Sequence, residues 1–261
     1  MAKKVLITGA SKGIGESMAR EFARRGWNLL LVARSTDILE KLKKELEQQY
    51  SISVGIQTCD LTDVSERNIL CEWVKNQGAL DALVNNAGFG STGAFKDLPL
   101  DRELRQVELN VATVVSLTHQ LLPLLCEQRG YIMNIASTAG FQPGPYMAVY
   151  YATKAFVLHF SEALSVELAA QGVSVTAHCP GATESEFAKV AGNDKTVLFS
   201  KMNHVMSRDV VAKHAVDSML ARKAVAISGW RNWLLAFTVR LNPRWMVRQL
   251  AGWINQPGKW S

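Results

Sequence analysis

The sequence predicts an α/β protein built on one doubly wound parallel sheet of about seven strands, with helices on both faces. Two observations support this class. Short apolar runs alternate along the chain with amphipathic segments of helical spacing, and the first apolar run ends in a glycine-rich turn. The 261 residues suit a single domain that buries roughly 70 to 75% of its unfolded surface, whereas two separate domains would be cramped.

The first apolar run, Val5 to Ile7, is typical of a buried parallel strand, and the segment from Ile14 to Arg25 has the spacing of an amphipathic helix. Between them, Gly9 permits a tight turn, Gly13 lets the backbone approach an anion, and Gly15 lets helix and strand pack closely. A glycine turn also connects strands to helices for purely steric reasons. The predicted phosphate-binding residues are Gly9, Ser11, Lys12, Gly13, Ile14 and Gly15.

The second strand, Trp27 to Val32, is followed by Arg34. In nucleotide-binding folds a carboxylate at this place bonds the ribose 2′-hydroxyl, whereas an arginine pairs with a 2′-phosphate. Lys12 could meet the same phosphate, so the pair favours NADP. Charge-assisted bonds are worth about 1.5 to 3 kcal/mol each, enough for a preference of tenfold or more. The alternative is that both are solvated surface cations.

Further elements follow the same alternation. We expect helices at 37–49, 104–126, 150–170 and 209–220, and strands at 53–58, 80–84, 131–136, 173–179 and 224–227. Asp60 follows the third strand. On local grounds it could equally be an N-cap or turn aspartate. Because Asp63 and Ser65 are better helix starters, Asp60 is expected to be free for a ligand.

The most specific pattern lies after the fifth strand. Ser137 stands at its carboxyl end, the edge where open α/β sheets bind ligands, and Tyr150 and Lys154 follow four residues apart on one helix face. With the Gly9-x-x-x-Gly13-x-Gly15 turn and the Asn85-Asn86-Ala87-Gly88 segment, the chain resembles the short-chain dehydrogenase/reductase family of the classical type. The resemblance covers residues 3 to about 228 and implies a Rossmann-type sheet.

The resemblance also implies further site residues. Asp60 and Leu61 would lie at the adenine, and Asn110 would hold a water that links the catalytic lysine to solvent; a satisfied core amide is the alternative for Asn110. A loop after the sixth strand would fold over the nicotinamide. There the match is partial, because Ser185 stands where the family has threonine. The remaining cofactor-binding residues implied are Asn86, Ala87, Gly88, Tyr150, Lys154, Pro180, Gly181 and Thr183.

The predicted chemistry follows from the residue types. Reduction of a carbonyl creates an alkoxide that needs a proton, and a phenol with a pKa near 10 is a poor acid–base catalyst at neutral pH. Lys154, helped by the positive charge of oxidised nicotinamide, would stabilise the phenolate of Tyr150 and lower its pKa, and its ammonium could also bond the nicotinamide ribose hydroxyls. Ser137 would donate to the substrate oxygen. Tyr151 is a competing candidate for the acid; the offset from Ser137 favours Tyr150.

The last forty residues differ from the rest. From residue 221 onward there are seven basic residues and no acidic one, whereas residues 1–220 carry 22 basic and 23 acidic groups, so the net charge of +6 does not indicate a nucleic-acid partner. Five of the seven tryptophans fall in this tail. Trp and Arg on an amphipathic helix interrupted at Asn242-Pro243 are typical of an interfacial membrane segment or an acyl-chain gate. The alternatives are a helix over the substrate mouth or a subunit interface.

The overall prediction is an NADP(H)-dependent oxidoreductase that interconverts a carbonyl and a secondary alcohol. Residues 1–228 would form the catalytic domain, with a substrate lid at about 184–205, and 229–261 a C-terminal extension packed on it. The alternatives are a membrane-associated reductase of lipid or 3-oxoacyl substrates and a non-catalytic NADP sensor.

Composition supports the remaining expectations. No run of about 18 uninterrupted apolar residues is present, and the first strand begins too early for a signal peptide, so we expect a cytoplasmic protein. Four cysteines without a CxxC pair indicate neither a metal site nor disulfides. The family resemblance implies a homo-oligomer that pairs through helices 104–126 and 150–170.

Overall fold

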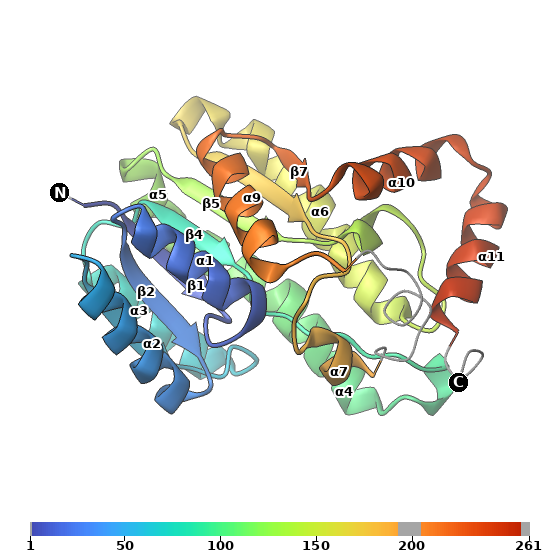
Figure 1. Ribbon diagram of the computed structural model, residues 1–261, viewed down its shortest axis with the longest axis horizontal. Coiled ribbons are helices and arrows are strands. Elements are labelled where there is room, and N and C mark those ends of the chain that lie inside the picture. The colour runs from blue at the N-terminus through green and yellow to red at the C-terminus, as the bar shows by residue number, and fades with distance from the viewer. Residues whose placement is uncertain (1, 193–204, 257–261) are drawn as a thin grey trace.

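The computed structural model describes residues 2–192 and 205–256 and contains a seven-stranded, entirely parallel sheet. The strand order is β3-β2-β1-β4-β5-β6-β7, which confirms the predicted doubly wound class (Figure 1). The strands are β1 (Lys4–Thr8), β2 (Asn28–Ala33), β3 (Val54–Thr58), β4 (Ala82–Asn85), β5 (Tyr131–Ile135), β6 (Ser174–Cys179) and β7 (Val225–Ile227).

Helices cover both faces of this sheet. The helices are α1 (Gly13–Arg24), α2 (Thr36–Gln49), α3 (Val64–Asn76), α4 (Leu100–Val107), α5 (Thr113–Glu127), α6 (Ala148–Glu167), α7 (Phe187–Ala191), α9 (Arg208–Leu220), α10 (Trp230–Leu241) and α11 (Arg244–Asn255). Buried side chains of α1, α2 and α9 share one core layer, and those of α3 and α5 share the layer beneath the other face.

The central strands are mostly apolar because both faces of the sheet are covered. Val5 and Ile7 of β1 enter the core layer under α1, whereas Leu6 enters the opposite layer with Leu70 of α3. The predicted strands are all present, most of them shifted by one or two residues at an end. Parallel pairing brings the carboxyl ends of all the strands to one edge of the sheet, and that edge positions the site.

The predicted helix 104–126 is longer and less regular than expected. It begins at Leu100, and a π-helical segment, Glu108–Ala112, separates α4 from α5. By length and composition the stretch Leu100–Glu127 could cross a membrane. However, α5 packs on β4, β5 and α3 with fully buried side chains such as Leu117 and Leu121, so it is a core helix here.

The tail forms two helices, α10 and α11, which break at Asn242 and Pro243 as predicted. They extend outward past β7, and α11 lies at the end of the molecule opposite α2 (Figure 1). Part of the predicted lid, residues 193–204, lies outside the described residues; α7 occupies its first half.

Candidate active site

The glycine turn after β1 has the geometry that its spacing predicts. Gly9 and Gly13 adopt φ values of +65° and +59°, which a residue with a Cβ rarely adopts. A Cβ on Gly15 would lie 2.2 Å from the Gly9 carbonyl oxygen, so only glycine lets α1 pack this closely on the turn. In the described chain no side chain caps the N-terminus of α1, which leaves its first N–H groups available to an anion.

A single cleft of about 1250 Å³ runs along the carboxyl edge of the sheet. Nearly all the predicted site residues line it; Gly15 lies beneath the turn, and Asn110 lies behind the wall. The predicted residues that line the cleft are Gly9, Ser11, Lys12, Gly13, Ile14, Arg34, Asp60, Leu61, Asn86, Ala87, Gly88, Ser137, Tyr150, Lys154, Pro180, Gly181 and Thr183.

Two cations stand at one end of the cleft. Lys12 precedes α1 and Arg34 follows β2, and both side chains are exposed and line the same cavity. Neither forms an ion pair within the described ranges. They can therefore meet an anionic group held between β1 and β2.

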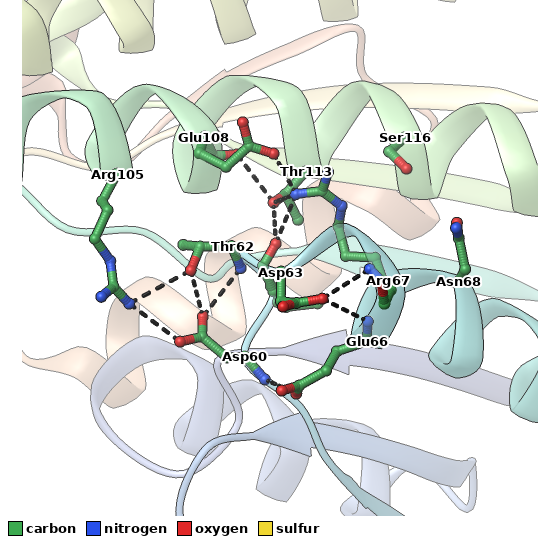
Figure 2. Close-up of polar contacts among 12 residues, drawn as sticks. Asp60, Thr62, Asp63, Glu66, Arg67, Asn68, Arg105, Glu108, Thr113 and Ser116 are labelled. Carbon is green, nitrogen blue, oxygen red and sulfur yellow. Dashed lines mark hydrogen bonds and ion pairs between the residues drawn. The ribbon is translucent and has the colours of Figure 1, made fainter. Parts of the chain in front are cut away.

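Asp60 lines the cleft, but its carboxylate is not free of protein partners; it is a turn aspartate, the alternative that the sequence left open. One carboxylate oxygen accepts from the Thr62 amide at 3.0 Å and hydroxyl at 2.7 Å, and the other accepts from Arg105 at 3.1 Å (Figure 2). Burial by itself would raise the pKa of Asp60, but the bonds from Thr62 and the charges of Arg105 and Arg34 outweigh it and lower the pKa. Asp63 caps α3 as predicted, through Ser65 and Glu66.

Behind Asp60, the buried Arg67 of α3 fixes the π-helical segment. Its guanidinium donates to the Leu61 carbonyl at 2.8 Å and to the Glu108 carboxylate, and the Thr113 hydroxyl also donates to Leu61 (Figure 2). These bonds tie the end of β3 to the helix that carries Asn110. The Glu108 carboxylate pairs the charge of this buried arginine and so offsets part of the cost of burying it.

Ser137 and Tyr150 meet in the middle of the cleft. Ser137 follows β5 by two residues, its hydroxyl accepts from the Ala139 amide at 3.1 Å, and it lines the cleft together with Tyr150. Burial raises the pKa of Tyr150, and the Ser137 hydrogen bond offsets only part of this. The protein side chains alone therefore do not produce the lowered Tyr150 pKa that we expected.

Lys154 lies one helical turn after Tyr150 on α6, with its Nζ 5.8 Å from the centre of the Tyr150 ring. The Nζ donates to the Ile135 carbonyl at 2.7 Å, which uses one of its three donors. Burial lowers the pKa of Lys154 to about 8. The ammonium therefore remains largely charged at neutral pH and points toward the catalytic side of the cleft.

Asn110 lies in the π-helical segment and is buried. Its amide nitrogen donates to the Phe89 carbonyl at 2.9 Å and to the Thr153 hydroxyl at 3.1 Å, and its oxygen accepts from the Phe89 amide at 3.2 Å. A Cβ on Gly88 would lie 3.0 Å from this oxygen and 3.7 Å from the Lys154 Nζ. Asn110 is thus a hydrogen-bonded amide near the lysine. This position suits both roles considered for it, a core amide and a holder of a water beside Lys154.

Tyr151, the competing candidate, points elsewhere. Its hydroxyl lies 3.1 and 3.3 Å from the two amide atoms of Asn255 on α11 and also bonds Gln142. Because this hydroxyl is already engaged by the tail, Tyr150 is the phenol available beside Ser137. No local sequence pattern predicts this contact, which joins residues 104 positions apart.

The loop after β6 crosses the cleft near the glycine turn. Ser185 lies against Gly13, whose added Cβ would come within 3.2 Å of the Ser185 Cβ. The Thr183 hydroxyl donates to the Gly181 carbonyl at 3.0 Å, and Gly181 packs so tightly on Asn232 of α10 that a Cβ would be 2.4 Å away. The loop is therefore held between the phosphate turn and the tail.

The tail supplies one wall of the cleft, which sequence reasoning offered only as an alternative. Its side chains there are predominantly apolar: Leu235, Ala236, Val239, Met246, Val247, Leu250, Ala251 and Ile254. Arg102 and Arg105 of α4 also line the cleft and were missed, because nothing in the local sequence separates them from solvated helix charges. Arg102 donates to the Val190 carbonyl of α7.

The fold and this cluster of serine, tyrosine and lysine at a sheet edge define an oxidoreductase with a Rossmann-type fold. The model of the short chain dehydrogenases matches residues 3–196. The chain belongs to the short-chain dehydrogenase/reductase family, as its motifs indicated.

Individual relatives agree with this assignment. A serine 3-dehydrogenase of Agrobacterium fabrum is 34% identical over 216 residues, which cover 80% of this chain and 85% of the relative. A short-chain dehydrogenase from Sphingobium yanoikuyae, solved in complex with NADPH, is 33% identical with a TM-score of 0.82, covering 92% of this chain and 94% of that one. A bulky-bulky ketone specific alcohol dehydrogenase from Comamonas testosteroni is 30% identical with a TM-score of 0.78, covering 92% of each chain.

Proposed function

We propose that the chain is an NADP(H)-dependent oxidoreductase that interconverts a bulky apolar ketone and its secondary alcohol. The observation that carries the proposal is the meeting of Ser137, Tyr150 and Lys154 in one cleft, with the Lys154 Nζ 5.8 Å from the Tyr150 ring; Lys12 and Arg34 line the same cleft.

The cleft fits a dinucleotide phosphate. The uncapped N-terminus of α1 and the glycine turn before it suit a pyrophosphate, and Lys12 with Arg34 suits a 2′-phosphate at the end of β2. Lys154 has two further N–H donors for ribose hydroxyls. The bound cofactor supplies the hydride and, when oxidised, a positive charge.

The protein residues supply the proton and hold the carbonyl. Ser137 donates a hydrogen bond to the substrate oxygen and stabilises the charge that develops there. The Tyr150 phenol, kept protonated by burial, transfers its proton to that oxygen in the direction of reduction. The charge of Lys154 stabilises the phenolate that remains, and the phenolate accepts the proton in the reverse direction.

The substrate class follows from the tail wall. Leu235, Val239, Leu250 and the other apolar tail residues line the same cleft as Tyr150, so they favour a substrate with large apolar groups on the carbonyl carbon. The Comamonas enzyme named above for bulky ketones supports the same class. A 3-oxoacyl thioester is the second candidate, since a putative ketoacyl reductase of Streptomyces coelicolor is 37% identical over 187 residues.

The test is NADPH consumption, with NADH alongside, over bulky ketones, small ketones and long-chain 3-oxoacyl thioesters. Tyr150→Phe should lose at least about a thousandfold in kcat while it still binds NADPH, because only the proton donor is removed. Tyr151→Phe is the matched control and should keep kcat within about threefold. If Tyr150→Phe kept its activity, the assignment would be refuted; NADPH binding without turnover of any substrate would instead support a sensor.

We also propose a cytoplasmic homo-oligomer that pairs through α5 and α6. Val115 on α5 and Phe156 and Val166 on α6 are 37, 40 and 77% exposed, which supports an interface on these helices. Sedimentation equilibrium of the native chain against Val166→Lys tests it, with dissociation expected in the variant.

A further inference from the structure

Helix α10 carries apolar side chains on two opposite faces. One face, with Leu235, Ala236 and Val239, lines the cleft. The other consists of five residues at positions i, i+3, i+4, i+7 and i+11, which share one side of a helix. This outer stripe contains Trp230, Trp233, Leu234, Phe237 and Leu241, each between 45 and 70% exposed.

The outer stripe is an ordered apolar surface. The rings of Trp233 and Phe237 stack with centroids 5.5 Å apart and planes within 4°. On α11, which follows α10 directly, Trp245 and Trp253 are also 61 and 44% exposed. Scattered single apolar residues on a surface are ordinary, but a stripe of this regularity marks an interaction site.

The charge around the stripe selects the partner. Arg240, Arg244 and Arg248 are exposed on the same two helices, and the sequence has no acidic residue from position 221 onward. A second copy of this chain would bring like charges together, whereas an anionic surface would neutralise them. Tryptophan rings prefer the headgroup level of a bilayer, and long arginine side chains reach anionic headgroups above an apolar contact.

We propose that the outer face of α10 and α11 docks on the surface of an anionic lipid bilayer. The two helices lie at the margin of the molecule, on the far side of β7 from the rest of the sheet (Figure 1). The stripe would lie in the interface plane, parallel to the bilayer.

Docking on the outer face leaves the inner face of α10 in place. The apolar wall of the cleft would then stand directly above the bilayer, close to lipophilic carbonyl compounds dissolved in it. This consequence for the substrate rests on the proposed function, whereas the docking itself does not and can be measured without any turnover.

The first test is flotation of the full chain with vesicles of phosphatidylcholine, either pure or with about 30 mol% phosphatidylglycerol. We expect binding to the anionic vesicles and a blue shift of tryptophan emission. The double variant Trp233→Ser/Phe237→Ser should lower the partition coefficient at least about tenfold. Val64→Ser/Ile69→Ser, which removes two apolar side chains of similar exposure from α3, is the matched control and should bind like the native chain.

The second test separates charge from apolar contact. Arg244→Gln/Arg248→Gln should reduce binding to the anionic vesicles about tenfold, and Lys41→Gln/Lys44→Gln on α2 should not. All four variants should keep NADPH affinity, which shows that they fold. Equal binding to both vesicle types, or an equal loss in the controls, would overturn the proposal. So would a dimer that Trp233→Ser/Phe237→Ser dissociates in a chain that binds no vesicles, because a second copy would then cover the stripe.

Discussion

The contact between Asn255 and Tyr151 should hold α11 against the catalytic helix α6. Asn255 is 2% exposed, and its amide atoms lie 3.1 and 3.3 Å from the Tyr151 hydroxyl. The variant Asn255→Leu keeps the side-chain size but leaves that buried hydroxyl with Gln142 alone. We expect a cost of about 1 to 2 kcal/mol, between a lost hydrogen bond and a fully unpaired group.

The loss of stability should be confined to α11, because in the described structure this helix buries only two further side chains, Val247 and Ala251. Amide hydrogen exchange across α11 should therefore accelerate about 5- to 30-fold, while the amides of β1 and β5 exchange as before. The KM for a bulky ketone should rise with kcat little changed, because the cleft wall loosens and the proton donor does not.

A double-mutant cycle makes the reasoning refutable. Tyr151→Phe leaves Asn255 unpaired and should also accelerate exchange, whereas Tyr151→Phe/Asn255→Leu removes both partners and should recover about 1 kcal/mol of the summed losses. Gln249→Leu on the exposed side of α11 is the control. If Asn255→Leu exchanged like the native chain, or the double variant lost the full sum, the bond would not anchor the tail.

Three further predictions concern the cofactor end and the lysine. Arg34→Glu should weaken NADPH binding tenfold or more and NADH binding much less, measured by fluorescence titration, and an equal loss for both would contradict the 2′-phosphate assignment. Gly15→Ala should lower the free energy of unfolding by urea by about 3 kcal/mol, because the new Cβ would meet the Gly9 carbonyl. The control Gly252→Ala lies within α11 with its nearest neighbour at 3.5 Å and should leave the stability unchanged or raise it. The folded protein releases the Lys154 proton near pH 8, whereas the unfolded chain keeps it to about pH 10.4. The difference in unfolding free energy between the native chain and Lys154→Met should therefore rise from pH 8 to about 10. A difference that does not change with pH would refute the lowered pKa.

The sheet and the main site could be predicted because each depends on local patterns. A strand covered on both faces must be apolar throughout, so Val5 to Ile7 and its counterparts stand out in the sequence. Tyr150 and Lys154 share a helix face through their spacing alone, and Ser137 stands where a strand must end. The carboxyl ends of parallel strands then bring these residues to one edge without further information.

The parts that could not be predicted depend on contacts between distant segments. Asp60 was expected to have no protein partner, because the neighbouring Asp63 was the better residue to cap the helix. The sequence does not show that Arg105 of α4 donates to the Asp60 carboxylate. The π-helical segment at Asn110 is stabilised partly by Arg67 and Thr113. The apolar spacing of a helix does not predict where a single turn contains an extra residue. The Tyr150 pKa differed because burial, which local sequence does not show, outweighs the hydrogen bond from Ser137.

The tail shows why two interpretations of one sequence can be complementary. From the sequence, the Trp- and Arg-rich helix was assigned either to the substrate mouth or to a membrane surface, on the assumption that it has a single apolar face. In the structure Leu235 and Val239 line the cleft, while Trp233 and Phe237 occupy the opposite side of the same helix. The inner face therefore forms the cleft wall, and the outer face remains available for the proposed bilayer. If Trp233→Ser/Phe237→Ser lost vesicle binding but kept the native KM for a water-soluble ketone, the two roles would be separate.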